Sequence, residues 1–219
     1  GFLKTGQGKP FSVFTPFKRR WIENFDISFL DIVKPSKAKK SSDIKSDISD
    51  LNYNKTHSAN LNLWPAGESA AQKNLENFLQ SKADFYSESR NSPIIDGTSR
   101  ISPYLALGIL SPKRCILEGL KLNNFEFTSG NKGICKWIDE IVWREFYRNI
   151  MHSFPKVSMN QPFQEYTKSI QWRHSSEELE AFYAGRTGFP IVDAGIRQML
   201  AEGWMHNRLR MVVAMFFTK

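Results

Sequence analysis

From residue 67 onward, apolar residues recur at the spacing of an α-helix, and this pattern limits the fold more than any other feature. Segment 70–86 places four of them on one helical face: Leu75, Phe78, Leu79 and Ala83. The same spacing predicts helices over 134–151, 190–200 and 204–217. Because alternating strand patterns are scarce after residue 66, the sequence predicts an all-α helical bundle without internal repeats.

The first third of the chain has a different character. Residues 1–13 contain two glycine breaks and a short apolar stretch, which we interpret as the remnant of a final β-strand. Thr15 and Pro16 are typical of a helix start, so a short helix is expected through Trp21. From 34 to 62 the composition shifts to Ser, Lys, Asp and Asn, which predicts a flexible, disordered linker.

Charge and composition narrow the class of protein. Residues 1–40 hold nine Lys and Arg against three Asp and Glu, a surplus of six out of a net charge of +8. The charge therefore predicts a basic leading segment rather than a basic binding face. No apolar run approaches a membrane span, and the two cysteines and four histidines match no metal-ligand spacing. We expect a cytoplasmic protein with no metal and no membrane segment.

A first group of chemically informative residues occupies 97–103. A glycine is followed by two hydroxyls and a guanidinium, just before the helix start at Ser102 and Pro103. Free N–H groups at a helix start, together with hydroxyls and an arginine, suit a phosphate or diphosphate. The alternative is an ordinary helix cap with a solvated Arg100.

A second group lies on the predicted helix over 137–148. One half of this helix carries aliphatic residues and Phe146 for the core. The other half interleaves aromatic and charged side chains: Trp137, Glu140, Trp143, Arg144, Tyr147 and Arg148. Such an arc suits stacking on bases or a planar cofactor, with Glu and Arg bonding to edges and phosphates. The alternative is packing on another helix, with Glu140 and Arg144 as an i,i+4 pair.

A third group lies in 204–211. Helical projection predicts a buried stripe through Met205, Leu209, Val212 and Phe216. It predicts a separate stripe formed by Trp204, Asn207, Arg208 and Met211. An amide beside an arginine and a methionine suits the edge of a heterocycle and a phosphate. The alternative is a polar seam between two helices.

All three groups lie within longer motifs that resemble the DNA photolyase/cryptochrome family. The motifs are Gly-Thr-Ser-Arg-Ile-Ser (97–102), Trp-x-x-Glu-x-x-Trp-Arg-Glu-Phe-Tyr-Arg (137–148), and the run from Arg-Thr-Gly-Phe-Pro (186–190) into Gly-Trp-Met-His-Asn-Arg-Leu-Arg-Met (203–211). The similarity is nearest to class I cyclobutane pyrimidine dimer photolyases and covers nearly the whole chain outside 34–62. The family pattern runs on past both ends, so we expect a fragment of such a protein.

The resemblance implies a deoxyribodipyrimidine photo-lyase, a carbon–carbon lyase that repairs DNA with light. Reduced FAD, excited by blue light, would donate an electron to a pyrimidine dimer flipped out of the DNA. It also implies three parts: 1–16 as the tail of an upstream α/β antenna domain, 17–66 as an interdomain linker, and 67–219 as the N-terminal part of a helical FAD- and DNA-binding domain. The antenna chromophore, folate or deazaflavin, would belong to the upstream domain.

The resemblance also implies roles for individual residues. Contacts with FAD fall on Tyr86, Thr98, Ser99, Arg100, Ile101, Ser102, Trp137, Asn207 and Arg210. Contacts with DNA or the dimer fall on Arg90, Glu140, Trp143, Arg144, Tyr147, Asn207, Arg208 and Met211. Two residues are catalytic candidates: Glu140 would hydrogen-bond the dimer, and Trp172 would be the exposed end of a three-tryptophan wire that photoreduces the flavin.

Three alternative functions remain at this point. A cryptochrome-like flavin photoreceptor would share the flavin loop without needing the lesion contacts, whereas Glu140, Trp143, Asn207 and Met211 are all present. A non-enzymatic helical nucleic-acid-binding module would need no flavin. A photolyase for the other major ultraviolet photoproduct would show a histidine pair where this chain has His206 and Asn207. The family resemblance predicts a monomer.

Overall fold

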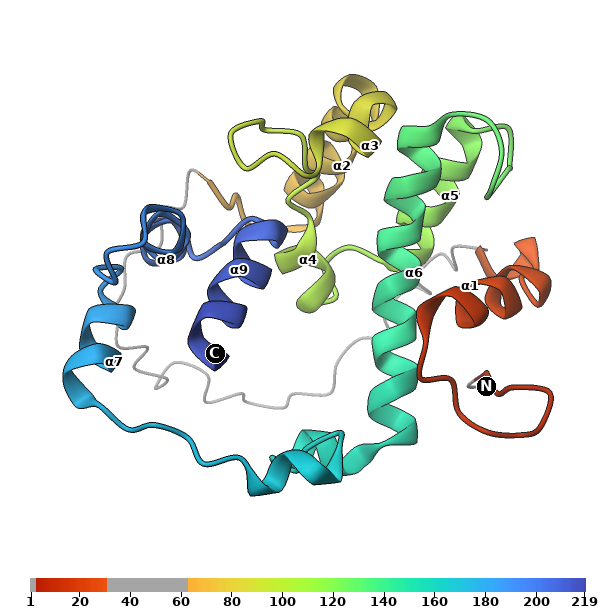
Figure 1. The fold of residues 1–219 in the computed structure, drawn as a ribbon. Helices are drawn as coiled ribbons and strands as arrows, with labels where there is room; N and C mark the ends of the chain where they lie inside the picture. The colour runs from red at the N-terminus through yellow and green to blue at the C-terminus, as the bar shows by residue number, and fades with distance from the viewer. Residues whose placement is uncertain (1–2, 31–62) are drawn as a thin grey trace, which may run out of the picture.

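The computed structural model describes residues 3–30 and 63–219. Its longest helix, α6, packs with α1, α3 and α5, while α7, α8 and α9 lie on the other side of the molecule (Figure 1). The α-helices are α1 (Phe14–Glu23), α2 (Glu68–Ser81), α3 (Tyr86–Ser89), α4 (Ser102–Ala106), α5 (Pro112–Leu122), α6 (Lys132–Ser153), α7 (Ser176–Tyr183), α8 (Pro190–Glu202) and α9 (Asn207–Thr218). Short 3-10 helices are η1 (Ile27–Leu30), η3 (Ala83–Phe85), η4 (Pro155–Met159) and η5 (Glu165–Ser169). The described residues form no named strand, and the all-α prediction is confirmed.

The start of α6 is fixed by a side-chain cap and a close backbone approach. The Asn131 side-chain oxygen accepts the Ile134 N–H at 3.0 Å, and its amide donates to Asp84 at 3.1 Å. Gly133 faces the backbone of η3 so closely that a Cβ would lie 2.2 Å from the Ala83 carbonyl oxygen. A glycine is therefore required where α6 meets η3 and α3.

The main core lies on α6 and includes side chains from α1 to α5. The predicted inward face of α6 is confirmed, since five of its residues are buried and one is partly buried: Ile134, Ile138, Ile141, Val142, Phe146 and Ile150. Trp137, predicted on the opposite arc, is also buried at 1% exposure and packs against Phe78 with ring centroids 5.3 Å apart. Because α5 and η3 both pack on α6, more of the helix is covered than a half-buried pattern predicts.

A second, smaller core joins α8 and α9, which lie with α7 on the other side of the molecule (Figure 1). Its members are Val192, Ile196, Met205, Leu209 and Val213. Gly195 allows the helices to approach, since a Cβ there would lie 3.2 Å from both Leu209 and Val213 side chains. Phe216, expected on the buried stripe, is 37% exposed.

The N-terminal segment differs from the predicted strand. Residues 3–13 form a tight turn with an isolated antiparallel bridge between Lys4 and Pro10. They do not form a strand because, in the described part of the chain, no neighbouring strand pairs with them. The short helix is confirmed as α1, whose Phe17 is buried against α6.

The predicted linker of 34–62 lies outside the described residues. The division of the chain at 16/17 and 66/67 stays a prediction, although α1 and η1 already pack with the helical core. Among the described residues, no helix combines the length and the apolar character needed to cross a membrane.

Candidate functional site

The residues singled out in the sequence converge where the end of α3, the middle of α6, the loop before α4 and the start of α9 meet. Arg90, just after α3, forms an ion pair with Glu140 of α6. Arg208 of α9 donates two hydrogen bonds to the side-chain oxygen of Asn91, at 2.9 and 2.6 Å. These contacts bring together segments that are 50 and 117 residues apart in the sequence.

Tyr86, Arg90 and Glu140 form one cluster of this junction. The Arg90 guanidinium lies over the Tyr86 ring, 5.4 Å from its centroid. Burial raises the pKa of Tyr86 to about 12, and the nearby Glu140 charge adds to this, while Arg90 and Arg208 oppose it. Tyr86 is therefore a neutral phenol that can donate a hydrogen bond.

The loop at 97–102 is held in a bent conformation through Arg100. This residue has φ of 48°, a left-handed backbone conformation that costs energy for a residue other than glycine. Its guanidinium pairs with Glu202 at 3.3 Å and with Asp96 at 3.5 Å, and lies 4.6 Å from the Trp204 ring centroid. The contact with Asp96 is made by the buried Arg100 Nε, which lies near the carboxylate without making a hydrogen bond.

The start of α9 is organised by His206, which is 2% exposed. Its Nδ1 accepts the Arg208 backbone N–H at 3.2 Å, so in the neutral ring the proton is assigned to Nε2. Burial, followed by the charge of Arg208, lowers the pKa of His206. Its Nε2 is a buried atom without a hydrogen-bond partner, like the Arg100 Nε.

Arg208 also donates to the Met211 sulfur at 3.4 Å, which confirms the predicted neighbourhood of these two residues on one stripe. Asn207 and Arg210 are exposed on the same turn of α9. The charges of Arg208, Arg210 and Arg100 all act on His206, and of these only Arg100 is paired with carboxylates, those of Glu202 and Asp96. Such an arrangement suits an anionic ligand.

An aromatic group borders the junction on α6. Phe14 of α1 lies flat on Trp143, with ring centroids 3.7 Å apart and planes 8° from parallel. Tyr147 lies against Trp143 at 5.6 Å and is 59% exposed. Arg144 donates to the Leu105 carbonyl at 3.3 Å, which ties α6 to α4. One face of Trp143 is therefore covered from within the protein.

Two predicted site residues lie apart from this arrangement. Trp137 is enclosed in the core and presents no open ring face. Trp172 is 55% exposed in the segment before α7. Within the loop at 97–102, Ile101 is buried, Ser102 is exposed, and Thr98 and Ser99 are half-buried.

Four residues of the junction were not predicted as site residues: Phe14, Asn91, Glu202 and His206. Asn91 and Glu202 act through contacts with distant arginines, and nothing in their local sequence indicates this. His206 directly precedes Asn207, so its place as the cap of α9 could have been inferred from the helix start.

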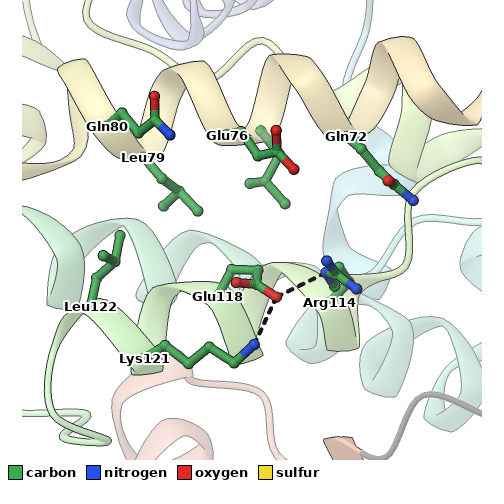
Figure 2. Close-up of a pocket in the computed structure, with 9 residues that line it drawn as sticks. Gln72, Glu76, Leu79, Gln80, Arg114, Glu118, Lys121 and Leu122 are labelled. Carbon is green, nitrogen blue, oxygen red and sulfur yellow. Dashed lines mark hydrogen bonds and ion pairs between the residues drawn. The ribbon is translucent and has the colours of Figure 1, made fainter.

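A pocket lies elsewhere, between α2 and α5 (Figure 2). Its volume is about 290 Å³, and it is lined by Leu75, Leu79 and Leu122 together with charged and amide side chains. Figure 2 shows Glu118 on α5 paired with both Arg114 and Lys121, at 2.9 and 3.1 Å. None of the predicted site residues lines it. Among the described residues, no three His, Cys, Asp or Glu side chains are grouped as a metal site.

Comparison with known proteins assigns this arrangement to a family. Residues 137–219 match the family described as the FAD binding domain of DNA photolyase. The whole chain is 38% identical to the deoxyribodipyrimidine photo-lyase of Salmonella typhimurium, of which it covers 46%. It is also 38% identical over its full length to the deoxyribodipyrimidine photo-lyase of Neurospora crassa, of which it covers 38%.

The fold agrees with a solved relative. The crystal structure of a bacterial class III photolyase from Agrobacterium tumefaciens superposes on 99% of this chain with a TM-score of 0.87 and 33% sequence identity, over 45% of the photolyase chain. The chain thus spans about half the length of the relatives it matches. The predicted likeness to class I enzymes in particular stays a prediction. On sequence and fold together, the chain belongs to the DNA photolyase family.

Proposed function

We propose that this chain forms part of a light-driven DNA repair enzyme that binds FAD and splits cyclobutane pyrimidine dimers. The observation that carries the proposal is the junction itself. A carboxylate, a neutral phenol and arginines from three distant segments meet there, beside an aromatic group on α6. This combination can bind an anionic phosphate chain and planar heterocycles at one place.

The residues at the junction fit FAD. Arg100 Nε and His206 Nε2 are two of only four buried side-chain N or O atoms without a hydrogen-bond partner in the described part of the chain. Buried donors normally have full partners. Arg100 Nε has only a 3.5 Å ion-pair contact with Asp96, and His206 only a weak contact with the Arg90 backbone, so neither donor is fully satisfied within the protein and both suit the acceptor atoms of a bound ligand. We assign Tyr86, the loop at 97–102, Asn207 and Arg210 to holding FAD. Trp137 would not contact FAD directly. It packs on Phe78, which in turn packs on Tyr86, so it would support Tyr86 from the core.

When bound, reduced FAD supplies the light-driven electron that opens the cyclobutane ring. The chain's own residues then bind and orient the dimer. Trp143, stacked on Phe14, and the exposed Tyr147 beside it would supply the aromatic surface for the bases. Stacking of this kind contributes about 1–3 kcal/mol per base. Glu140 provides a polar partner for the base edge, and Met211 lies on the same side as Arg208.

Arginines at the rim would hold the DNA strand. Arg208 is only partly buried, and its contact with Asn91 fixes it at the start of α9. Arg144 is tied to α4 and is assigned to supporting the aromatic surface of α6. Flipping the dimer out of the duplex costs a few kcal/mol, least for a damaged pair, and these contacts offset that cost. Trp172, exposed before α7, is assigned to photoreduction of the flavin.

The remaining assignments follow from the family. DNA containing pyrimidine dimers is the partner, and we propose that the protein acts as a monomer in the cytoplasm. A folate or deazaflavin antenna chromophore would bind to the upstream domain, not to the helices described above.

Selective binding of damaged DNA tests the proposal. The intact protein is titrated with a duplex carrying one thymine dimer and with the same duplex undamaged, using wild type and Trp143→Ala. We expect the substitution to weaken binding of the dimer duplex by roughly fivefold to 150-fold, since about 1–3 kcal/mol of stacking is lost. Binding of the undamaged duplex should stay unchanged.

Equal weakening on both duplexes would contradict the stacking role and favour a general nucleic-acid-binding module. A matched control is Trp21→Ala. Trp21 packs on Phe25 and Phe127, away from the junction, and its loss should alter neither affinity.

A further inference from the structure

We propose that Asn91 is a positioning residue for Arg208. Its neutral amide oxygen holds the guanidinium in one direction and leaves the charge free to bind a phosphate of the DNA backbone. The inference rests on the proposed function, because it concerns how the rim of that site holds DNA.

Both ends of the contact between Asn91 and Arg208 are fixed by the backbone. Asn91 lies in the turn after α3, where the Ser92 N–H donates to the Ser89 carbonyl at 3.1 Å. This turn begins the segment between α3 and α4, which extends toward the side of the molecule that holds α8 and α9 (Figure 1). Arg208 lies in the first turn of α9, where its backbone N–H donates to His206 Nδ1 at 3.2 Å. The acceptor and the donor are therefore both placed before a ligand binds.

The side-chain contacts fix the plane of the guanidinium. The Nε and one Nη of Arg208 donate to the same Asn91 oxygen, at 2.9 and 2.6 Å, and the other Nη donates to the Met211 sulfur at 3.4 Å. These bonds use three of the five N–H groups of the guanidinium, so two remain available to a ligand within the part of the chain that the structure describes. Two N–H groups on a plane that is already held suit the oxygens of a phosphate.

The Asn91 amide carries no charge, so it orients Arg208 without cancelling the positive charge. Among the described residues Arg208 forms no ion pair, whereas Arg100 pairs with both Glu202 and Asp96. A cation that is oriented but unpaired offers a phosphate both direction and charge. Because phosphate contacts carry no information about the bases, this contact should act equally on damaged and undamaged DNA.

The test uses the intact protein with Asn91→Leu, Asn91→Asp, Arg208→Met, and Asn91→Leu combined with Arg208→Met. Affinities for the dimer duplex and for the same duplex undamaged are measured over a range of salt concentrations, and the FAD retained by each variant is measured by absorbance. The matched control is Asn77→Leu, since Asn77 is an exposed asparagine on α2.

Asn91→Leu removes the acceptor and keeps the Arg208 charge. We expect it to weaken binding of both duplexes by about twofold to tenfold, the cost of ordering a free side chain when DNA binds, with the slope of log affinity against log salt concentration unchanged. Arg208→Met should reduce this slope by about 0.9, and in its background Asn91→Leu should have little further effect. Retained FAD should match wild type throughout, as should both affinities of Asn77→Leu.

Asn91→Asp separates positioning from simple structural support. A carboxylate can accept the same two hydrogen bonds, so the melting temperature should be kept, but it also pairs with the Arg208 charge. We therefore expect binding of both duplexes to weaken by up to about fivefold and the salt slope to fall by up to about 0.9. A residue that only joined the turn to α9 would keep the wild-type affinity and slope when replaced by aspartate.

Wild-type affinity and slope for Asn91→Asp, or an undiminished effect of Asn91→Leu in the Arg208→Met background, would overturn the inference. Loss of FAD from Asn91→Leu with unchanged DNA binding would also overturn it and assign the contact to the phosphates of FAD. If Asn91→Leu does not fold, Asn91→Ala replaces it, with the same expected and overturning results. Failure of the wild type to distinguish the two duplexes would instead overturn the proposed function, while the undamaged duplex would still test the role of Asn91.

Discussion

Replacing Phe14 with alanine should loosen the attachment of α1 to the aromatic surface of α6. The Phe14 ring lies 3.7 Å from Trp143 and almost parallel to it, and its centroid is 5.9 Å from that of Phe146. It is the first residue of α1, so these contacts fix the start of the helix against α6. The same contacts hold Trp143 in the orientation that the proposed function requires.

The expected size of the effect follows from the burial of the ring. Truncating a fully buried phenylalanine costs about 3–5 kcal/mol. Phe14 is half-buried, so we expect about 2 kcal/mol, of which roughly 1 kcal/mol comes from the stacked geometry. Phe14→Leu keeps apolar contact without stacking, so its expected cost is about 1 kcal/mol.

Hydrogen exchange of the α1 backbone, followed by mass spectrometry in the intact protein, measures this local opening. A loss of about 2 kcal/mol predicts roughly 30-fold faster exchange for Phe14→Ala, and about 1 kcal/mol predicts roughly fivefold for Phe14→Leu. Val13→Ala is the control, since Val13 is 59% exposed. Unchanged exchange of α1 in Phe14→Ala would refute the reasoning.

Three further substitutions follow from the structure. Asp193→Asn should lower the melting temperature at pH 7 and make it depend less on pH. The hydrogen bond from the Thr187 hydroxyl lowers the pKa of Asp193, so the ionised carboxylate stabilises the wild type above about pH 4, and this stabilisation is lost as the pH falls through the folded-state pKa. Thermal melts of both proteins at pH 7 and pH 3 would check this. The pKa of His206, measured by NMR, should lie below the usual value of about 6.5. The neutral ring caps α9 through Nδ1, so this stabilisation should be complete above about pH 6.5 and lost on acidification in the wild type, but not in His206→Asn. Trp172→Phe should change stability by less than about 0.5 kcal/mol but slow photoreduction of bound FAD, measured by absorbance under blue light; an unchanged rate would contradict its assigned role.

The inward face of α6 could be predicted from the sequence because the pattern is long and regular. Apolar residues recur at helical spacing over more than four turns, and burial of this face follows from amphipathicity alone. Trp137 shows the limit of that reasoning. Its burial depends on η3 and α5 packing against a second side of α6, and the spacing of residues within one helix carries no information about such neighbours.

The candidate site shows the same division between local and distant contacts. The pairing of Arg208 with Met211 could be predicted because both lie on one helix, three residues apart. The i,i+4 pair of Glu140 and Arg144 was a reasonable alternative, but Glu140 pairs with Arg90 instead, 50 residues away, and Arg144 reaches the Leu105 carbonyl and Glu145. Which partner a charged side chain takes depends on the tertiary fold.

The central claim is that this chain contributes to a site where light and reduced FAD split pyrimidine dimers. The most direct measurement is chromatographic quantification of thymine dimers in an oligonucleotide after incubation with the intact protein and reduced FAD, under blue light and in the dark. The account predicts loss of dimers and recovery of intact thymines in the illuminated sample alone. Flavin retained by the protein with no loss of dimers under light would contradict the claim and favour a flavin photoreceptor.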